Sequence, residues 1–205
     1  MPLRRITSIG ALVGAFALAL PASGPAAGGA KQQGLAGHLL VAAPRMADPR
    51  FSRTVIFMVR HDASGAMGII VNRPFEDVPI ASLLDRLGLS HEGMSGSLRI
   101  HYGGPVGPGT VFVLHTPDFR GPKTTIVGNG VAVTGTADVL RALGSGKGPR
   151  RALLALSYSG WGPGQLEREI QAGAWIAVAA DPALVFDGDY ETKWERAMAR
   201  RDFEL

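Results

Sequence analysis

The sequence predicts a single α+β domain whose β-sheet is mainly antiparallel. Short apolar runs rich in β-branched and aromatic residues, separated by glycine, proline and aspartate, are typical of strands. Two hairpin signals connect neighbouring runs: the turn at 62–65 and the Asn129-Gly130 dipeptide. Apolar residues three and four apart, as in residues 80–89, indicate helices between the strands. Because no second-domain boundary interrupts this order, the chain fits the α+β class.

The elements follow from these local signals. The expected strands are residues 38–44, 54–61, 66–72, 98–102, 110–116, two short strands within 124–135, 151–161 and 174–181. The expected helices are residues 80–89, a helix capped by Thr136 that stops at Gly144, a helix from Pro163 to Gly173, and a polar helix at 190–203.

Two proline-containing segments are expected to be turns. Residues 103–109, "GGPVGPG", combine glycine and proline and predict a rigid turn. Asn72-Arg73-Pro74 is expected to end a hairpin strand, because Pro74 keeps Arg73 out of helical geometry and Asn72 hydrogen-bonds locally.

The first thirty residues differ from the rest of the chain. Arg4 and Arg5 precede an apolar run at 9–20, and small residues with helix breakers follow at 21–30. This layout is typical of a secretory signal peptide, and the run is shorter than the ~20 residues that span a bilayer. We expect a signal peptide at 1–30, a linker at 31–37, one domain at 38–205, and a periplasmic mature chain without a stable membrane span. The alternative is a cytoplasmic protein whose start was assigned too early.

Composition excludes several kinds of chemistry. The chain has no cysteine, so disulfides, thiolate catalysis and thiolate metal ligands are absent. The formal net charge is +4, of which Arg4 and Arg5 supply two charges, and the other basic residues are scattered. Nucleic-acid binders usually concentrate basic residues on one face, so a nucleic-acid partner is not expected. The arginines near the C-terminus are instead expected to lie on a solvated helix face.

No catalytic pattern is complete. Ser157 and Ser159 lack the glycines of the Gly-x-Ser-x-Gly elbow. None of the five histidines has another histidine three or four residues away, so no helical metal pair is predicted. A pairing of His101 with His115 across strands stays open. We therefore predict no catalytic residue, no metal and no cofactor.

Polar and aromatic residues at strand ends and helix starts are the remaining candidates for a binding groove. They are Arg53, Asn72, Arg73, His115, Trp161, Gln165 and Glu169. The alternative interpretation is that these residues are turn and cap residues that hold the corners of the sheet.

Four segments together resemble the AlgH/YqgE family of bacterial proteins in their order and spacing. They are residues 48–74, 103–106, 113–116 and 158–175, of which "GAMGIIVNRP" at 65–74 and "GWGPGQLE" at 160–167 are the most specific. The resemblance covers about residues 39–194 and implies a bifurcated sheet that forms a pseudo-barrel with flanking helices. It supplies no agreed catalytic residues, because the family has no established biochemical activity.

The leading hypothesis is therefore a non-enzymatic binding or regulatory module that acts through a partner protein or a small ligand. One alternative is a hydrolase-type enzyme with an unrecognised site among the groove candidates. Another is a cytosolic transcriptional regulator, since one branch of the family is linked to the control of alginate production. An export leader would argue against the regulator, because an exported protein cannot act at DNA.

Overall fold

The computed structural model describes residues 34–128 and 130–203. The predicted signal peptide and the start of the predicted linker lie outside these residues. The strands are β1 (His38–Ala42), β2 (Val55–Asp62), β3 (Gly65–Ile70), β4 (Pro74–Pro79), β5 (Ser97–Tyr102), β6 (Val106–His115), β7 (Thr124–Gly128), β8 (Val131–Thr134), β9 (Ala152–Trp161) and β10 (Trp175–Ala179). The helices are α1 (Ile80–Arg86), α2 (Asp138–Gly144), α3 (Gln165–Gln171), α4 (Pro182–Phe186) and α5 (Lys193–Ala199), with a 3-10 turn at Arg200–Phe203.

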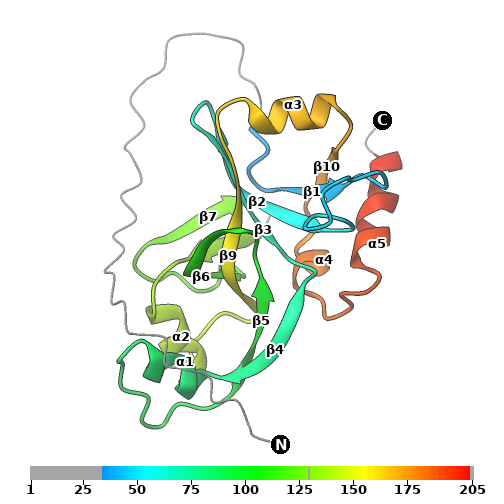
Figure 1. Ribbon diagram of the computed structural model, residues 1–205. Helices are drawn as coiled ribbons and strands as arrows, with labels where there is room; N and C mark the ends of the chain where they lie inside the picture. Colours follow the sequence, from blue (N-terminus) through cyan, green and yellow to red (C-terminus); the bar gives the residue numbers. More distant parts are fainter. Residues whose placement is uncertain (1–33, 129, 204–205) are drawn as a thin grey trace, which may run out of the picture. The chain divides into compact units, whose positions relative to one another are not determined.

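Strand β9 is the branch point of the sheet. At Leu154 it pairs with β5 in parallel and with β6 in antiparallel orientation. Near its end it pairs with β3, where Ser159 lies opposite Gly68. One path of strands therefore runs β10-β1-β2-β3-β9-β6-β8-β7, while β5 and β4 branch away from β9 (Figure 1). The predicted single α+β domain with a mainly antiparallel, bifurcated sheet is confirmed.

Alternate residues of the first strands face two different cores, as expected for extended backbone. Leu39 and Phe57 pack with Leu114 of β6 and Val133 of β8, so the curled sheet encloses this cluster. Their neighbours Leu40 and Ile56 face the other way and pack against Leu166 of α3 and two tryptophans. Both faces of these strands are buried, which explains their continuous apolar sequence.

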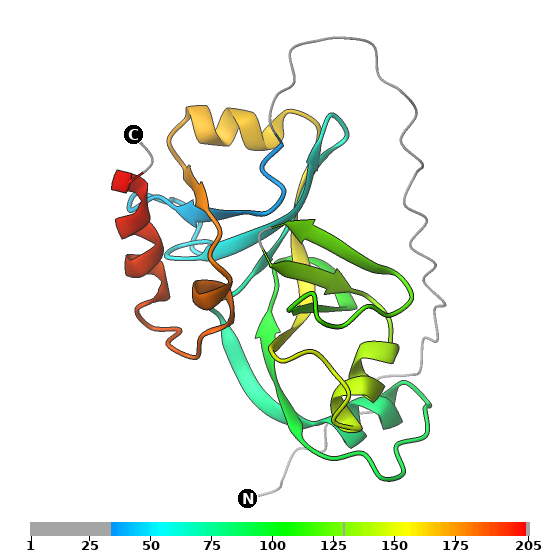
Figure 2. The ribbon, with the colours of Figure 1, turned by 180° about the vertical axis from the view of Figure 1, so that it is seen from behind.

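The helices cover separate parts of the sheet. Figures 1 and 2 show α3 across one end, α1 and α2 side by side at the other, and α4 and α5 together beside β1 and β10. Leu84 of α1 and Leu140 of α2 form a third apolar cluster with Ile100 of β5 and Leu154 of β9. None of the helices within residues 34–128 and 130–203 is long and apolar enough to cross a membrane.

Two turn predictions need correction. Val106–Gly109 belong to β6 and are not a turn: Gly107 and Gly109 have φ values of 66° and 89°, and the pairing with β9 shifts between Val106 and Val111. A bulge of this kind lets a strand contain left-handed glycines. Asn72-Arg73-Pro74 does follow the hairpin strand, but Pro74 also begins β4, which was not predicted. β4 is mostly exposed and pairs with β5 alone, so it lacks an alternating apolar pattern.

Two helix predictions also change, and one helix was not predicted. The Thr136 hydroxyl donates to the Pro122 carbonyl and does not cap α2, whose N-cap is Ala137. The short helix α4 was missed, although Asp181 caps it by accepting a hydrogen bond from the Ala183 amide. The helix predicted at 190–203 begins at Lys193 and buries that lysine, so it is less solvated than its charges suggest.

Candidate functional site

A solvent-open groove of about 620 Å³ lies where the loop before β2, the corner before β4 and the start of α5 meet. Its walls come from segments far apart in the sequence. The lining residues are Ser52, Arg53, Asn72, Arg73, Pro74, Phe75, Tyr102, Glu191 and Trp194.

Asn72 holds the first wall in place. Its Oδ1 accepts a hydrogen bond from the Val55 amide, and its Nδ2 donates to the Arg53 carbonyl, both at 2.9 Å. The expected local hydrogen bond of Asn72 is therefore replaced by bonds to a distant loop. Arg53 has φ 55°, a left-handed conformation that non-glycine residues seldom adopt. Residues held in such conformations often occur at binding and catalytic sites.

The two arginines of the groove differ in their partners. The Arg53 guanidinium lies 4.5 Å from the centre of the Trp194 ring and forms an ion pair with Glu195. The Trp194 indole donates to the Ala42 carbonyl at 2.8 Å, which fixes the ring under Arg53. Arg73 donates one hydrogen bond to the Ser52 carbonyl at 2.8 Å and forms no ion pair with any described residue.

An exposed aromatic side chain completes the groove. Phe75 is 63% exposed, more than Leu87 and Ile126, the other exposed large apolar side chains of the described residues. Its ring meets Tyr102 edge-on, with 6.2 Å between ring centres. Arginine and aromatic residues are the side chains enriched at binding hot spots.

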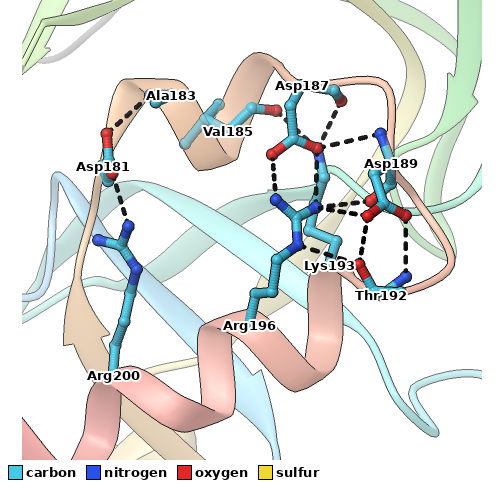
Figure 3. Close-up of polar contacts among 9 residues, drawn as sticks. All are labelled: Asp181, Ala183, Val185, Asp187, Asp189, Thr192, Lys193, Arg196 and Arg200. Carbon is cyan, nitrogen blue, oxygen red and sulfur yellow. Dashed lines mark hydrogen bonds and ion pairs between the residues drawn. The ribbon is translucent and has the colours of Figure 1, made fainter.

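Hydrogen bonds and ion pairs between α5 and residues 181–189 position the helix that forms the opposite wall of the groove (Figure 3). Both oxygens of Asp187 accept hydrogen bonds from Arg196, at 2.7 and 2.9 Å. The buried Lys193 ammonium donates to the carbonyls of Val185 and Asp187 at 3.0 and 3.1 Å, and burial lowers the pKa of Lys193 to about 8. The Arg196 side chain is 40% exposed with its charge paired to Asp187. These contacts set where Trp194 meets the groove.

A second polar cluster surrounds the half-buried Glu169, outside the residues that line the groove. One carboxylate oxygen of Glu169 accepts hydrogen bonds from the indoles of Trp161 and Trp175, at 2.9 and 2.8 Å. The other accepts from the Gln165 side chain at 2.9 Å, while Gln165 accepts from the Gly162 amide. These contacts tie α3 to β9 and β10. The glutamate that ends the Gly-Trp-x-x-Gly-Gln-Leu-Glu segment is Glu167, which instead contacts the His61 ring at 3.0 Å.

His115 lies in a third place. Its Nδ1 donates to the Thr116 carbonyl at 2.8 Å, and its Nε2 accepts from the Thr134 hydroxyl at 2.9 Å. Burial lowers the pKa of His115. Although a hydroxyl bonded to an imidazole can act as a nucleophile, His115 is 0% and Thr134 1% exposed, so the pair is closed to a substrate.

The structure thus separates the seven groove candidates into three groups. Arg53, Asn72 and Arg73 line one groove. Trp161, Gln165 and Glu169 bond one another elsewhere, and His115 bonds Thr134. Sequence reasoning missed Phe75 and Trp194. An isolated phenylalanine in the polar segment "NRPFED" and a tryptophan in a charged helix were the available signals.

The other chemical candidates are also internal. The hydroxyl of Ser157 donates to the Gly104 carbonyl, and that of Ser159 donates to the Gly103 carbonyl at 3.2 Å. His101 faces Tyr190, so the open alternative of a His101–His115 pair does not form. Within the described part of the chain, no three His, Asp or Glu side chains are arranged to hold a metal.

A family model of AlgH-like proteins matches residues 39–205. The chain belongs to the AlgH-like family. A UPF0301 protein of Caulobacter vibrioides is 49% identical over 168 residues, which are 81% of this chain and 86% of that protein. A UPF0301 protein of Rhodospirillum rubrum is 45% identical over 166 residues, with the same shares.

Two solved structures have the same fold as this AlgH-like chain. The solution structure of AlgH from Pseudomonas aeruginosa has a TM-score of 0.69 and 36% identity, and the match covers 87% of this chain and 94% of AlgH. Protein DIP2367 of Corynebacterium diphtheriae has a TM-score of 0.64 at 22% identity, covering 80% and 85%, and shows likeness of fold alone. The bifurcated sheet predicted from the AlgH/YqgE resemblance as a pseudo-barrel is therefore the family fold, here curled into a half-barrel.

Acid is expected to destabilise this domain through the buried His101, which pairs with Pro74 between β5 and β4. Burial lowers the pKa of His101 to about 4, and Lys193 and Arg99, both positive, act in the same direction. Because the unfolded histidine has a pKa near 6.5, the unfolded state binds the proton more readily at intermediate pH. The free energy of unfolding should therefore fall by about 2–3 kcal/mol between pH 6.5 and pH 4.

Urea unfolding at several pH values tests this expectation. His101→Leu should remove most of the dependence of the unfolding free energy on pH between pH 4 and pH 6.5. The remaining dependence should come from His115, whose pKa is also lowered by burial. A slope that His101→Leu leaves unchanged would show that other groups take up the proton.

Proposed function

We propose that this AlgH-like protein is a non-enzymatic binding module and that its groove at Arg73 and Phe75 is the binding surface. The observation that carries the proposal is an uncompensated arginine beside an exposed phenylalanine. A half-buried guanidinium without a carboxylate partner retains most of its donors for a ligand. Phe75 offers apolar surface that gains free energy when a ligand covers it.

The same residues give less support to an enzyme. The hydroxyl–imidazole pair at Thr134 and His115 is buried, and the hydroxyls of Ser157 and Ser159 are bound to backbone carbonyls. A hydrolase needs a nucleophile and a base within reach of each other and of substrate. A DNA-binding regulator also gains little support, because the C-terminal arginines Arg196 and Arg200 pair with aspartates.

Fragment binding mapped by amide NMR tests the proposal. We expect a mixed fragment library to shift the amides of Ser52, Arg53, Arg73, Phe75 and Trp194 most strongly. The double variant Arg73→Ala, Phe75→Ala should lose these shifts and keep the rest of its spectrum. Arg86→Ala, an exposed arginine on α1, is the matched control.

Two results would contradict the proposal. Fragment shifts that cluster elsewhere would move the binding surface. Turnover of ester or amide substrates that disappears in the double variant would make the groove an active site.

A further inference from the structure

The charges of the groove suggest what its ligand carries. Three charged side chains line the groove: Arg53, Arg73 and Glu191. Arg53 is neutralised by Glu195. Arg73 and Glu191 form no ion pair with any described residue, so one positive and one negative charge are open to a ligand.

The apolar part of the groove lies next to the open cation. Phe75 follows Arg73 by two residues, and side chains two apart in extended backbone point to the same side. The edge-on contact with Tyr102 widens the apolar surface. A ligand that pairs with the Arg73 guanidinium and covers the Phe75–Tyr102 surface therefore carries a carboxylate and an apolar group a few ångströms apart.

The surroundings favour a protein segment over a nucleic acid. Glu76 follows Phe75 directly and is exposed, and Glu191 lines the groove near the start of α5. These carboxylates would repel successive phosphates, whereas nucleic-acid grooves are positive along their length. The groove is also open and partly polar, unlike the enclosed apolar pockets that hold small molecules.

We infer that the groove binds an extended segment of a partner protein in which an aspartate or glutamate lies within two residues of an aromatic or large aliphatic side chain. The carboxylate pairs with the Arg73 fork, and the apolar side chain covers Phe75 and Tyr102. A basic residue further along the segment lies opposite Glu191. This inference rests on the proposed function and names the class of partner.

A random dodecapeptide library, selected on the wild-type protein and counter-selected on Arg73→Ala, tests the inference. We expect the surviving peptides to share an acidic residue within two positions of an apolar one. A synthetic peptide of that consensus should bind Arg73→Ala about tenfold or more weakly, since its carboxylate loses the hydrogen bonds from a charged donor. The affinity of Arg73→Lys should lie between those of wild type and Arg73→Ala, because lysine keeps the charge but loses the paired N–H donors of the guanidinium.

Controls separate recognition from folding. Arg86→Ala should bind the peptide within about twofold of wild type, since α1 follows the end of β4 that is away from the groove residue Pro74 (Figure 1). Arg73→Glu should lose the consensus peptide and bind a version whose acidic residue is replaced by lysine. This exchange of charges cannot be produced by a misfolded variant.

The outcomes distinguish this inference from the proposed function. The inferred partner class would be wrong if the selected peptides lack an acidic residue, or if Arg73→Ala binds them as tightly as wild type does. The proposed function would still stand in that case if fragments shift the amides of the groove. Binding of single-stranded dT15 or phenylacetate in place of any peptide would overturn the partner class in the same way. If neither peptides nor fragments reach the groove, both are wrong.

Discussion

Replacing Gly104 with alanine is expected to destabilise the domain by about 3–5 kcal/mol, the sum of left-handed backbone strain and overpacking. Gly104 has φ 148°, and a Cβ there would lie 2.3 Å from the Tyr158 carbonyl carbon and 2.4 Å from the Ser159 nitrogen. Both atoms are backbone of β9, so neither moves without disturbing the strand that joins the two parts of the sheet. Urea unfolding followed by circular dichroism measures the loss.

Two other glycines separate the causes. Gly135→Ala adds a methyl group that has no neighbour within 4 Å, and the backbone of Gly135 does not have a positive φ. Gly146→Ala also meets no atom within 4 Å but has φ 72°, so it reports backbone strain alone. We expect almost no change for the first and about 1 kcal/mol for the second. Equal effects at Gly104 and Gly146 would show that β9 yields to the added methyl group.

Removing the Glu169 carboxylate is expected to cost about 3–4 kcal/mol, because two indole N–H groups lose a charged acceptor. Trp161 and Trp175 are 7% and 3% exposed, so water replaces the lost bonds poorly. The Glu169→Ala variant should unfold at lower urea concentration and change its tryptophan fluorescence. Glu169→Gln should lose less of the free energy of unfolding, since its amide oxygen still accepts a hydrogen bond from one indole N–H.

Glu92→Ala is the matched control for this change, because Glu92 is an exposed glutamate in the loop after α1. Its effect should stay within about 0.5 kcal/mol. If Glu169→Ala is no more harmful than Glu92→Ala, then the Glu169 cluster does not hold α3 to the sheet. The same result would make the exposed Gln165 and the half-buried Glu169 candidates for ligand binding again.

The predicted elements agree with the structure where a local pattern was strong. β2 and β3 form the hairpin expected from the turn at 62–65, and β9 and β10 lie in the apolar runs assigned to them. Elements stabilised by other parts of the fold were missed or shortened. β4 is an exposed strand made by its pairing with β5. The five-residue α4 is held by the Asp181 cap and by the hydrogen bond from Lys193 of α5 to the Val185 carbonyl.

The candidate site was predicted less well than the fold. Residue type and position singled out Arg53, Asn72 and Arg73, which do line one groove. The same reasoning selected Trp161, Gln165 and Glu169, whose polar atoms satisfy one another. A local sequence shows that a side chain is polar and lies near a strand end, but it does not show which other side chain it faces.

The sequence by itself determined the α+β class, most strands, and the family, because these depend on apolar periodicity, turn residues and motif spacing along the chain. Only the tertiary structure decided that the strand ending at Trp161 joins two parts of the sheet and that Arg73, Phe75 and Trp194 share a groove. These residues come from segments about 120 positions apart, brought together by strand pairing and burial. Whether a polar residue is buried with a partner or open to a ligand depends on those long-range contacts.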